Sequence, residues 1–218
     1  MRKAIEATTL IGYSGHAFVV ADVILATGRS LYGYFEREQK TTNPYKLKYL
    51  GEDSATQLIA LPPGVDLFVA VGNNHHRKVI TERLLTCDRK LAFPALHPSA
   101  VVSPLACISA GVLLAPQVTV NALAKVEVGV ILNTSSIIEH ECVIEAFAHI
   151  APGAVLAGNV RVGEGAFVGA NAIIKQGVNI GQWSTIGAGA VVLEDVAPRT
   201  TVIGNPAKRI SPPLSPRP

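Results

Sequence analysis

The chain contains 218 residues, of which 49% are apolar and 6% aromatic, and its formal net charge is +3. This length fits one large domain or two modest ones, and the dispersed charge, without a run of Lys or Arg, argues against nucleic acid as a partner. Three widely spaced cysteines indicate neither a disulfide framework nor a metal site. No apolar run reaches the roughly 18 residues that cross a bilayer, and the N-terminus is a poor signal peptide, so we expect a cytoplasmic protein that does not enter a membrane.

Strands and helices alternate in the first hundred residues. We expect strands at residues 8–11, 31–35, 67–71 and 91–96, and helices at residues 17–26, 54–61 and 74–85. Residues 36–51 are polar and are expected to form a loop. This alternation predicts a small parallel α/β sheet of Rossmann type, which we assign to residues 1–97.

The turn after the first expected strand lies where such a sheet normally binds phosphates or a nucleotide. It reads GYSGHA at residues 12–17, so it lacks the third glycine of the dinucleotide fingerprint. Glu36, just past the second strand, is the nearest candidate for the acidic residue of such a site. A mononucleotide is therefore favoured over NAD, and a purely structural tight turn is the alternative. Asn73 and Asn74 follow the third strand, where they either reach a base or ribose or cap the next helix.

A six-residue repeat occupies the second half of the chain. From Val102 to Val192 an aliphatic residue recurs at every sixth position, sixteen times in succession, and a small residue or Val stands two positions before each. Three such units close a triangular coil, so residues 98–210 are predicted to form a parallel β-helix rather than a β-sandwich, whose turns would not hold this phase. The glycines directly after the aliphatic residue are expected to ease the bends, and they are Gly163, Gly169, Gly181 and Gly187. The tail at residues 211–218 contains four prolines and is expected to be disordered.

The most polar part of the repeat region, residues 133–149, contains a candidate catalytic pair. His140 occupies an outward-facing position, and histidine titrates near neutrality, as a general base must. Glu141 is adjacent and can orient the ring. Gly158 follows one coil later and should stack beneath His140, where its N–H can hold an oxyanion. The alternative is a solvated surface pair without a catalytic role.

A prism of stacked coils forms its pockets between neighbouring chains, so we expect a homotrimer. His149 lies half a coil from His140, and both histidines can line one pocket only if they belong to adjacent subunits. Ala170 and Ala188 form a column that Pro152 continues. A stripe of compact side chains suits a narrow pantetheine arm, although it equally suits packing at a subunit interface.

Five segments give the chain a resemblance to a known family over almost its whole length. They are GYSGHAFVVADV, VAVGNNHHRKVI, ILNTSSIIEHECVI, HIAPGAVLAGNV and IGNPAKRI. In these segments the chain resembles the bacterial sugar acetyltransferases of the bacillosamine, perosamine and sialic acid types. The resemblance implies an α/β nucleotide-sugar domain followed by a left-handed β-helix, assembled as trimers.

The family's functional residues map onto matching positions of this chain. The resemblance implies that His140 is the general base and Glu141 its partner. It places acetyl-CoA contacts at His149, Gly158, Ala170 and Ala188, and nucleotide-sugar contacts at Gly15, His16, Glu36, Asn73 and Asn133. The family often has Asp where this chain has Glu36, which is followed here by Arg37, so the base is left open between uridine and guanosine.

The activity implied by the resemblance is transfer of an acetyl group from acetyl-CoA to the amine of a nucleotide-linked amino sugar, without a metal. A UDP-4-amino-4,6-dideoxy sugar is the expected acceptor. One alternative is O-acetylation of sialic acid or another sugar hydroxyl. The other is a non-catalytic coil that serves as an assembly or ligand-sensing module.

Overall fold

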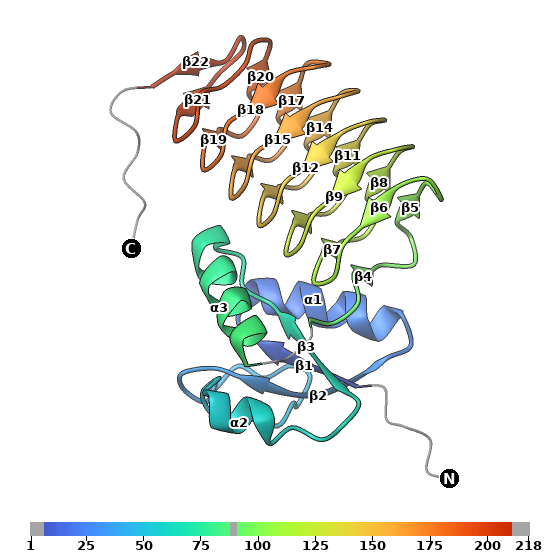
Figure 1. Cartoon of the computed structure of the whole chain (residues 1–218), viewed down its shortest axis with the longest axis vertical. Coiled ribbons are helices and arrows are strands. Elements are labelled where there is room, and N and C mark those ends of the chain that lie inside the picture. Colours follow the sequence, from blue (N-terminus) through green and yellow to red (C-terminus); the bar gives the residue numbers. More distant parts are fainter. Residues whose placement is uncertain (1–6, 88–90, 211–218) are drawn as a thin grey trace.

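A computed structural model describes residues 7–87 and 91–210. The tail predicted to be disordered, residues 211–218, lies outside the described residues. The described chain forms an α/β domain with a long coil stacked against it (Figure 1). Within the described ranges, every helix is too short or too polar to span a membrane.

The N-terminal domain contains a parallel three-stranded sheet of order β2-β1-β3. Its strands are β1 (Ala7–Ile11), β2 (Ser30–Phe35) and β3 (Val65–Val69), and its helices are α1 (Gly15–Ala26), α2 (Ala55–Ile59) and α3 (Asn74–Thr86). One face of the sheet packs on α1 and on the coil, while α2 and α3 cover the other face. All six elements lie within two residues of the positions predicted from the sequence.

The strand expected at residues 91–96 does not complete this sheet. Leu91 forms only an isolated parallel bridge with Leu67 of β3. The next residues form β4 (Ala95–Leu96), which pairs with the coil strand β7 instead. The prediction was wrong here because the apolar run LAFPAL contains Pro94, which cannot donate to a ladder, so pairing passes from one domain to the other within this segment.

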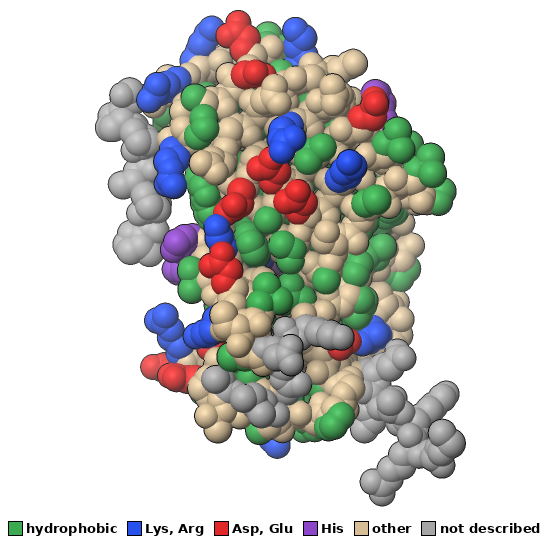
Figure 2. Space-filling view, viewed as in Figure 1, with side chains coloured by type: hydrophobic (Ala, Val, Ile, Leu, Met, Phe, Trp, Pro, Cys, Tyr) green, Lys and Arg blue, Asp and Glu red, His purple; other side chains and the backbone are tan. Residues whose placement is uncertain are grey.

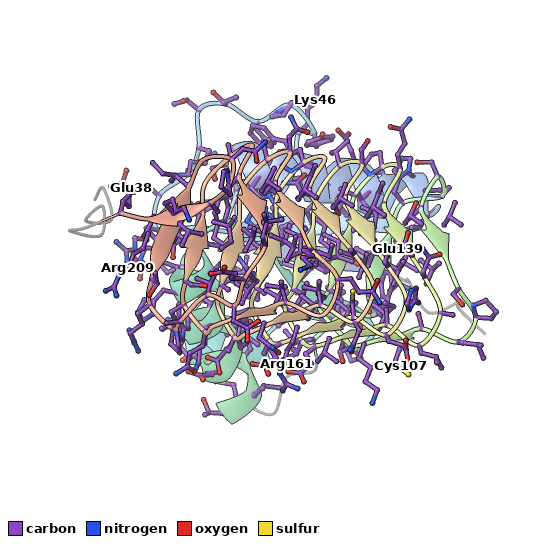
Figure 3. All side chains as sticks on the ribbon, turned by 90° about the horizontal axis from the view of Figure 1, so that it is seen from above. Glu38, Lys46, Cys107, Glu139, Arg161 and Arg209 are labelled. Atoms are coloured by element: carbon purple, nitrogen blue, oxygen red, sulfur yellow. The ribbon has the colours of Figure 1, made fainter. Side chains whose placement is uncertain are left out.

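The coil is a left-handed β-helix with three faces. The first face contains β4, β7 (Leu113–Leu114), β10 (Ile131–Leu132), β13 (His149–Ile150), β16 (Phe167–Val168), β19 (Thr185–Ile186), β21 (Thr201–Ile203) and the antiparallel β22 (Lys208–Arg209). The second contains β5 (Val101–Val102), β8 (Thr119–Val120), β11 (Ile137–Ile138), β14 (Val155–Leu156), β17 (Ile173–Ile174) and β20 (Val191–Val192). The third contains β6 (Cys107–Ile108), β9 (Lys125–Val126), β12 (Val143–Ile144), β15 (Arg161–Val162) and β18 (Asn179–Ile180). Figure 3 labels Cys107 and Arg161, which both lie on the third face.

The six-residue repeat fills the interior as the sequence predicts. The second residue of the coil strands points inward, and with the small residue two positions before it forms one continuous core through the coil. Parallel pairing joins each strand to the strand one coil later, as Ile131 joins His149. Stacking of short strands with the same pattern therefore lets neighbouring coils bury apolar side chains that a single coil would leave exposed.

The bends have a different cause from the one expected. Gly163 and Gly181 are required by close approach, because a Cβ there would lie 2.6 Å and 2.3 Å from backbone nitrogens of the next coil. The left-handed residues stand two positions further on and recur every six residues: Gly111, Gln117, Leu123, Gly129, Ser135, Glu141, Phe147, Gly153, Asn159, Gly165, Asn171, Gly177, Trp183 and Gly189. Many are not glycine, so the stacked coils hold ordinary residues in a conformation they rarely adopt alone.

The faces meet at three corners. The first corner, between the first and second faces, contains Asn133, Ala170 and Ala188, and the second corner, between the second and third faces, contains His140 and Gly158. The N-terminal domain covers the first face, where the outward side chains of β7 and β10 are buried in its core. Helix α3 reaches the third corner. On the second face, the outward side chains of Val101 and Ile173 are exposed.

Candidate active site

His140 and Glu141 form a hydrogen-bonded dyad at the second corner. The His140 Nδ1 atom lies 3.0 Å from Glu141 Oε2, and both side chains are about half exposed, at 52% and 57%. Glu141 has a left-handed backbone, with φ of 62°, which turns its carboxylate beside the ring. A carboxylate only accepts hydrogen bonds, so Nδ1 is the donor to Glu141. The dyad therefore leaves Nε2, next to Gly158, as the ring nitrogen without a bond to the carboxylate.

Gly158 lies directly beneath this imidazole. A Cβ at Gly158 would stand 2.4 Å from His140 Cε1 and 2.5 Å from Nε2, so only glycine leaves room for the ring in this position. The main chains are joined there as well, because the Asn159 N–H donates to the carbonyl of His140 at 2.8 Å. Within the described residues the N–H of Gly158 donates to no group. The stacking of residues 18 apart expected from the sequence is confirmed.

A second group of expected site residues lies on the first face, beside the start of α1. The rings of His16 and His149 have their centres 6.3 Å apart. The Asn133 Nδ2 atom lies 3.2 Å from His149 Nε2, and Asn133 Oδ1 accepts from its neighbour's N–H, which fixes the amide orientation. Asn133 therefore donates to Nε2, and His149 is held as a neutral ring.

Electrostatics keep both histidines of this group uncharged. Burial, followed by the nearby Arg77 cation, lowers the pKa of His149 to about 3 and the pKa of His16 to about 4. A half-buried imidazole near a fully buried guanidinium cannot hold a proton at neutral pH. His149 and His16 are thus suited to hydrogen bonding and packing, whereas the His140 side chain is half exposed.

A cavity of about 710 Å³ opens at the carboxyl end of the sheet of the N-terminal domain. Its lining combines apolar, acidic and basic side chains: Ile11, Gly12, Ser14, Phe35, Glu36, Arg37, Asp53, Val71, Gly72, Asn73, His75, His76, Val79, Ile80 and Arg83. This is the edge at which parallel α/β sheets bind nucleotides. Gly15 begins α1 directly beside it, so three of the expected nucleotide residues, Gly15, Glu36 and Asn73, lie in or next to one cavity.

Two of those residues already have structural partners. Glu36 accepts hydrogen bonds from the N–H groups of Tyr13 and Arg37, each at 3.1 Å, so its carboxylate fixes the turn after β1. Asn73 caps α3 by accepting from the His76 N–H at 3.0 Å. Asn74 points away from the cavity, because its amide donates to the carbonyl of Gly165 in the coil at 3.0 Å. The capping alternative therefore describes the side chain of Asn73, and Asn74 joins the two domains.

Ala170 and Ala188 occupy the first corner in one column with Pro152. The Asn171 N–H donates to the Pro152 carbonyl, and the Gly189 N–H donates to the Ala170 carbonyl. This column is a flat strip without long side chains. It is separated from His140 of the same chain by the whole second face.

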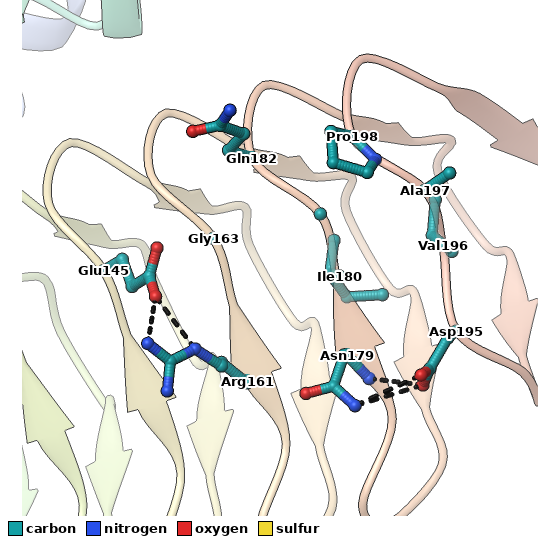
Figure 4. A pocket seen from close by; sticks show the side chains of 11 residues that line it. Glu145, Arg161, Gly163, Asn179, Ile180, Gln182, Asp195, Val196, Ala197 and Pro198 are labelled. Carbon is teal, nitrogen blue, oxygen red and sulfur yellow. Dashed lines mark hydrogen bonds and ion pairs between the residues drawn. The ribbon is translucent and has the colours of Figure 1, made fainter.

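The third corner carries a further shallow groove of about 530 Å³, which no expected site residue lines (Figure 4). Its charged side chains are paired, since Arg161 binds Glu145 and Asn179 binds Asp195. Figure 2 shows acidic and basic side chains interspersed over the coil on that view of the molecule. Within the described residues, no group of three or more His, Cys, Asp or Glu side chains could hold a metal ion.

Comparisons with known proteins agree with this fold. Sequence profiles match residues 9–84 to the PglD N-terminal domain and residues 159–194 to the hexapeptide repeat of succinyl-transferase. The acetyltransferase domain of PglB from Neisseria gonorrhoeae, solved with acetyl coenzyme A, is 36% identical with a TM-score of 0.88, covering 94% of this chain and 99% of that one. The chain belongs to the PglD-type hexapeptide-repeat sugar acetyltransferases.

Two further members of this family are similar to the chain. PerB of Caulobacter crescentus, solved with CoA and GDP-perosamine, is 34% identical with a TM-score of 0.88, covering 95% of this chain and 99% of that one. A GDP-perosamine N-acetyl transferase of the same organism has been solved with CoA and GDP-perosamine and with a histidine replaced by alanine. UDP-N-acetylbacillosamine N-acetyltransferase of Bacillus subtilis is 37% identical over 108 residues, a match that spans about half of each protein, 48% of this chain and 49% of the relative.

Sequence reasoning missed the residues that join the two domains. Arg77, Asn74 and Lys78 of α3 all bind the third corner of the coil. Each lies in a polar helix start, NNHHRK, whose pattern indicates a solvated surface. These side chains contact the coil only because α3 packs close to the third corner, and no local sequence pattern encodes that packing.

Proposed function

We propose that the protein transfers the acetyl group of acetyl-CoA to the amine of a nucleotide-linked amino sugar. The observation that carries this proposal is the His140–Glu141 dyad with its imidazole against Gly158. The amine attacks the thioester carbonyl, Nε2 of His140 takes its proton, and the Gly158 N–H stabilises the oxyanion. Collapse of the tetrahedral intermediate breaks the C–S bond, and CoA leaves as a thiolate. Glu141 stabilises the imidazolium that forms in between.

The complete site needs a second copy of the chain. The outward residues of the second face are Val101, Thr119, Ile137, Val155, Ile173 and Val191. Five of these six are β-branched aliphatic residues, and Val101 and Ile173 are 65% and 49% exposed. The corresponding residues of the third face are mostly polar, with Lys125, Arg161 and Asn179 among them. An apolar face between polar surroundings supports burial against other copies.

Closed three-fold packing through the second face explains the separation of the predicted site residues. Such packing sets the second corner of one subunit, with His140, against the first corner of the next. The column at Ala170 and Ala188 then lines the opposite wall of a groove whose floor carries Gly158. Acetyl-CoA in this groove places its thioester near His140, while Asn133 and the large cavity of the neighbouring subunit hold the nucleotide sugar.

The acceptor class is best tested by direct comparison of nucleotide sugars. The Bacillus relative is named for a UDP sugar and the Caulobacter relative was solved with a GDP sugar. We expect release of free CoA with UDP- or GDP-4-amino-4,6-dideoxy sugars and none with the matching 4-hydroxy sugars. Acetylation of the 4-hydroxy sugars instead would reject N-acetylation and favour an O-acetyltransferase. Binding of a nucleotide sugar without CoA release from any acceptor would indicate a non-catalytic module.

Replacement of the proposed base tests the mechanism. His140→Ala should lower kcat by about 10²- to 10⁴-fold and leave the affinity for acetyl-CoA close to that of the wild type. His97→Ala serves as the control, because His97 lies at the start of the coil and, within the described residues, its ring bonds only to nearby Ser99. Near-normal turnover of the folded His140→Ala protein would reject this base.

A further inference from the structure

The most deeply buried charge of the described chain is Arg77 of α3. Its side chain is 1% exposed, and it is a long cation enclosed between the two domains. Its Nη1 donates to the carbonyls of Val71 and Gly72, both at 3.1 Å. Nε donates to the carbonyl of Gly129 at 2.6 Å, and Nη2 donates to that of Phe147 at 2.7 Å. In the described part of the chain its partners are neutral oxygens, not carboxylates.

This arrangement is unusual because a buried charge is normally paired with an opposite charge. Here the positive charge is balanced only by carbonyl dipoles that converge on a planar fork. Burial lowers the pKa of Arg77 to about 9, and the group still carries its charge at neutral pH. Lysine has three donors on one nitrogen and cannot reach the carbonyls of both domains at once, as the three guanidinium nitrogens do. The geometry therefore favours arginine.

The partners of Arg77 lie on both halves of the proposed site. Val71 and Gly72 belong to the loop that lines the large cavity. Phe147 stands two residues before His149 in the coil. Gly72 also touches both histidines, since it backs onto the His16 ring and its carbonyl bonds to His149. One side chain therefore connects the wall of the cavity to the strand that carries His149.

We propose that Arg77 is a positioning residue, which fixes the nucleotide-sugar cavity against the coil and holds His16 and His149 in place beside each other. This inference rests on the proposed acetyltransferase function. The acceptor is bound by the N-terminal domain and the donor by the coil, so the contact between these domains sets the position of the amine relative to the thioester. A displacement of about 1 Å between reacting groups can cost on the order of 10²-fold in rate.

The test compares variants of two neighbouring cations. Arg77→Lys keeps the positive charge but loses the planar set of guanidinium hydrogen bonds, and Arg77→Met loses both. Lys78→Gln is the matched control. Lys78 also joins α3 to the coil, through an ion pair with Glu164, but at the partly exposed edge. Each full-length variant is measured for kcat and KM with acetyl-CoA and an active nucleotide sugar, and for the titration midpoints of its histidines by NMR.

We expect Arg77→Lys to lower kcat by about tenfold or more while each KM changes by less than about threefold. Arg77→Met should show the same loss and, in addition, an upward shift of the His16 and His149 midpoints, because the nearby cation is gone. Lys78→Gln should change neither readout. The titrations need no substrate, so they test the role of Arg77 even if the wild-type protein acetylates none of the sugars, a result that would reject the proposed function alone.

A milder variant covers the case in which Arg77→Met does not fold. Asn74 accepts from Arg77 Nη2 at 2.9 Å and donates to the coil, so Asn74→Ala loosens the same contact without leaving an unpaired charge. It should lower kcat about threefold or more, again without a matching change in KM. If folded Arg77→Lys and Asn74→Ala both retain wild-type kcat, the positioning role is wrong.

Discussion

The clearest test of the proposed catalytic corner is Gly158→Ala, because its effect follows from the distances around Gly158. The added methyl group would lie 2.4 Å from His140 Cε1. Carbon atoms need about 3.5 Å, so the imidazole must move by about 1 Å. The ring is half exposed and can swing outward, and Gly158 has no left-handed backbone that would strain an alanine. We therefore expect a well-folded protein in which the base is misplaced.

A shift of about 1 Å at a reacting group predicts a loss in kcat on the order of 10²-fold, while the melting temperature should stay within a few degrees of the wild-type value. The assay follows release of the CoA thiol with a saturating amino-sugar nucleotide. The control is the double variant with His140→Ala, in which the ring is absent and the glycine substitution should cost little more. Wild-type turnover by folded Gly158→Ala would refute the assignment of this corner as the active site.

Three other predictions concern the dyad, the assembly and the pH dependence of stability. Glu141→Gln should lower kcat by about tenfold or more without changing KM, as measured by steady-state kinetics, because an amide cannot stabilise the imidazolium. Ile173→Arg on the second face should convert trimers to monomers in light-scattering measurements and abolish activity, whereas Cys107→Arg on the third face should do neither. The contribution of neutral His16 and His149 to the free energy of unfolding should be fully present above pH 6.5 and should fall as the pH drops from about 6.5 towards 3. The reason is that the pKa of each histidine is lower in the folded protein, so the unfolded chain binds protons first. Between pH 7 and pH 4, the melting temperature of His149→Gln should fall less steeply with decreasing pH than that of the wild type. An unchanged dependence on pH would contradict the buried neutral pair.

The coil could be predicted from sequence because its physical requirement repeats. Each coil must place an aliphatic and a small residue inward, so the six-residue phase reports the fold directly. The same period predicts that Gly158 lies under His140, since the next coil follows 18 residues later. The α/β elements were predicted for a similar reason, because apolar strands and helices alternate on a local scale.

Contacts between the two domains could not be predicted in this way. The segment from Leu91 to Leu96 has the composition of a sheet strand, yet it serves both domains in turn. Arg77 has the local signature of an exposed helical residue, and only the third corner of the coil buries it. The need for glycine at position 163 could not be predicted correctly either. It arises from the approach of the next coil's backbone, which is a tertiary contact and not a property of the bend.

Subunit complementation tests the shared active site most directly. His140→Ala removes the base from the second corner, and Ala188→Trp blocks the donor groove at the first corner, so each variant alone should be inactive. When the two are unfolded together and reassembled in equal amounts, some interfaces combine an intact His140 from one chain with an intact Ala188 from the next. Random three-fold assembly should then restore about a quarter of wild-type activity. No recovery in mixed trimers, or full activity of a monomer, would contradict a site built from two subunits.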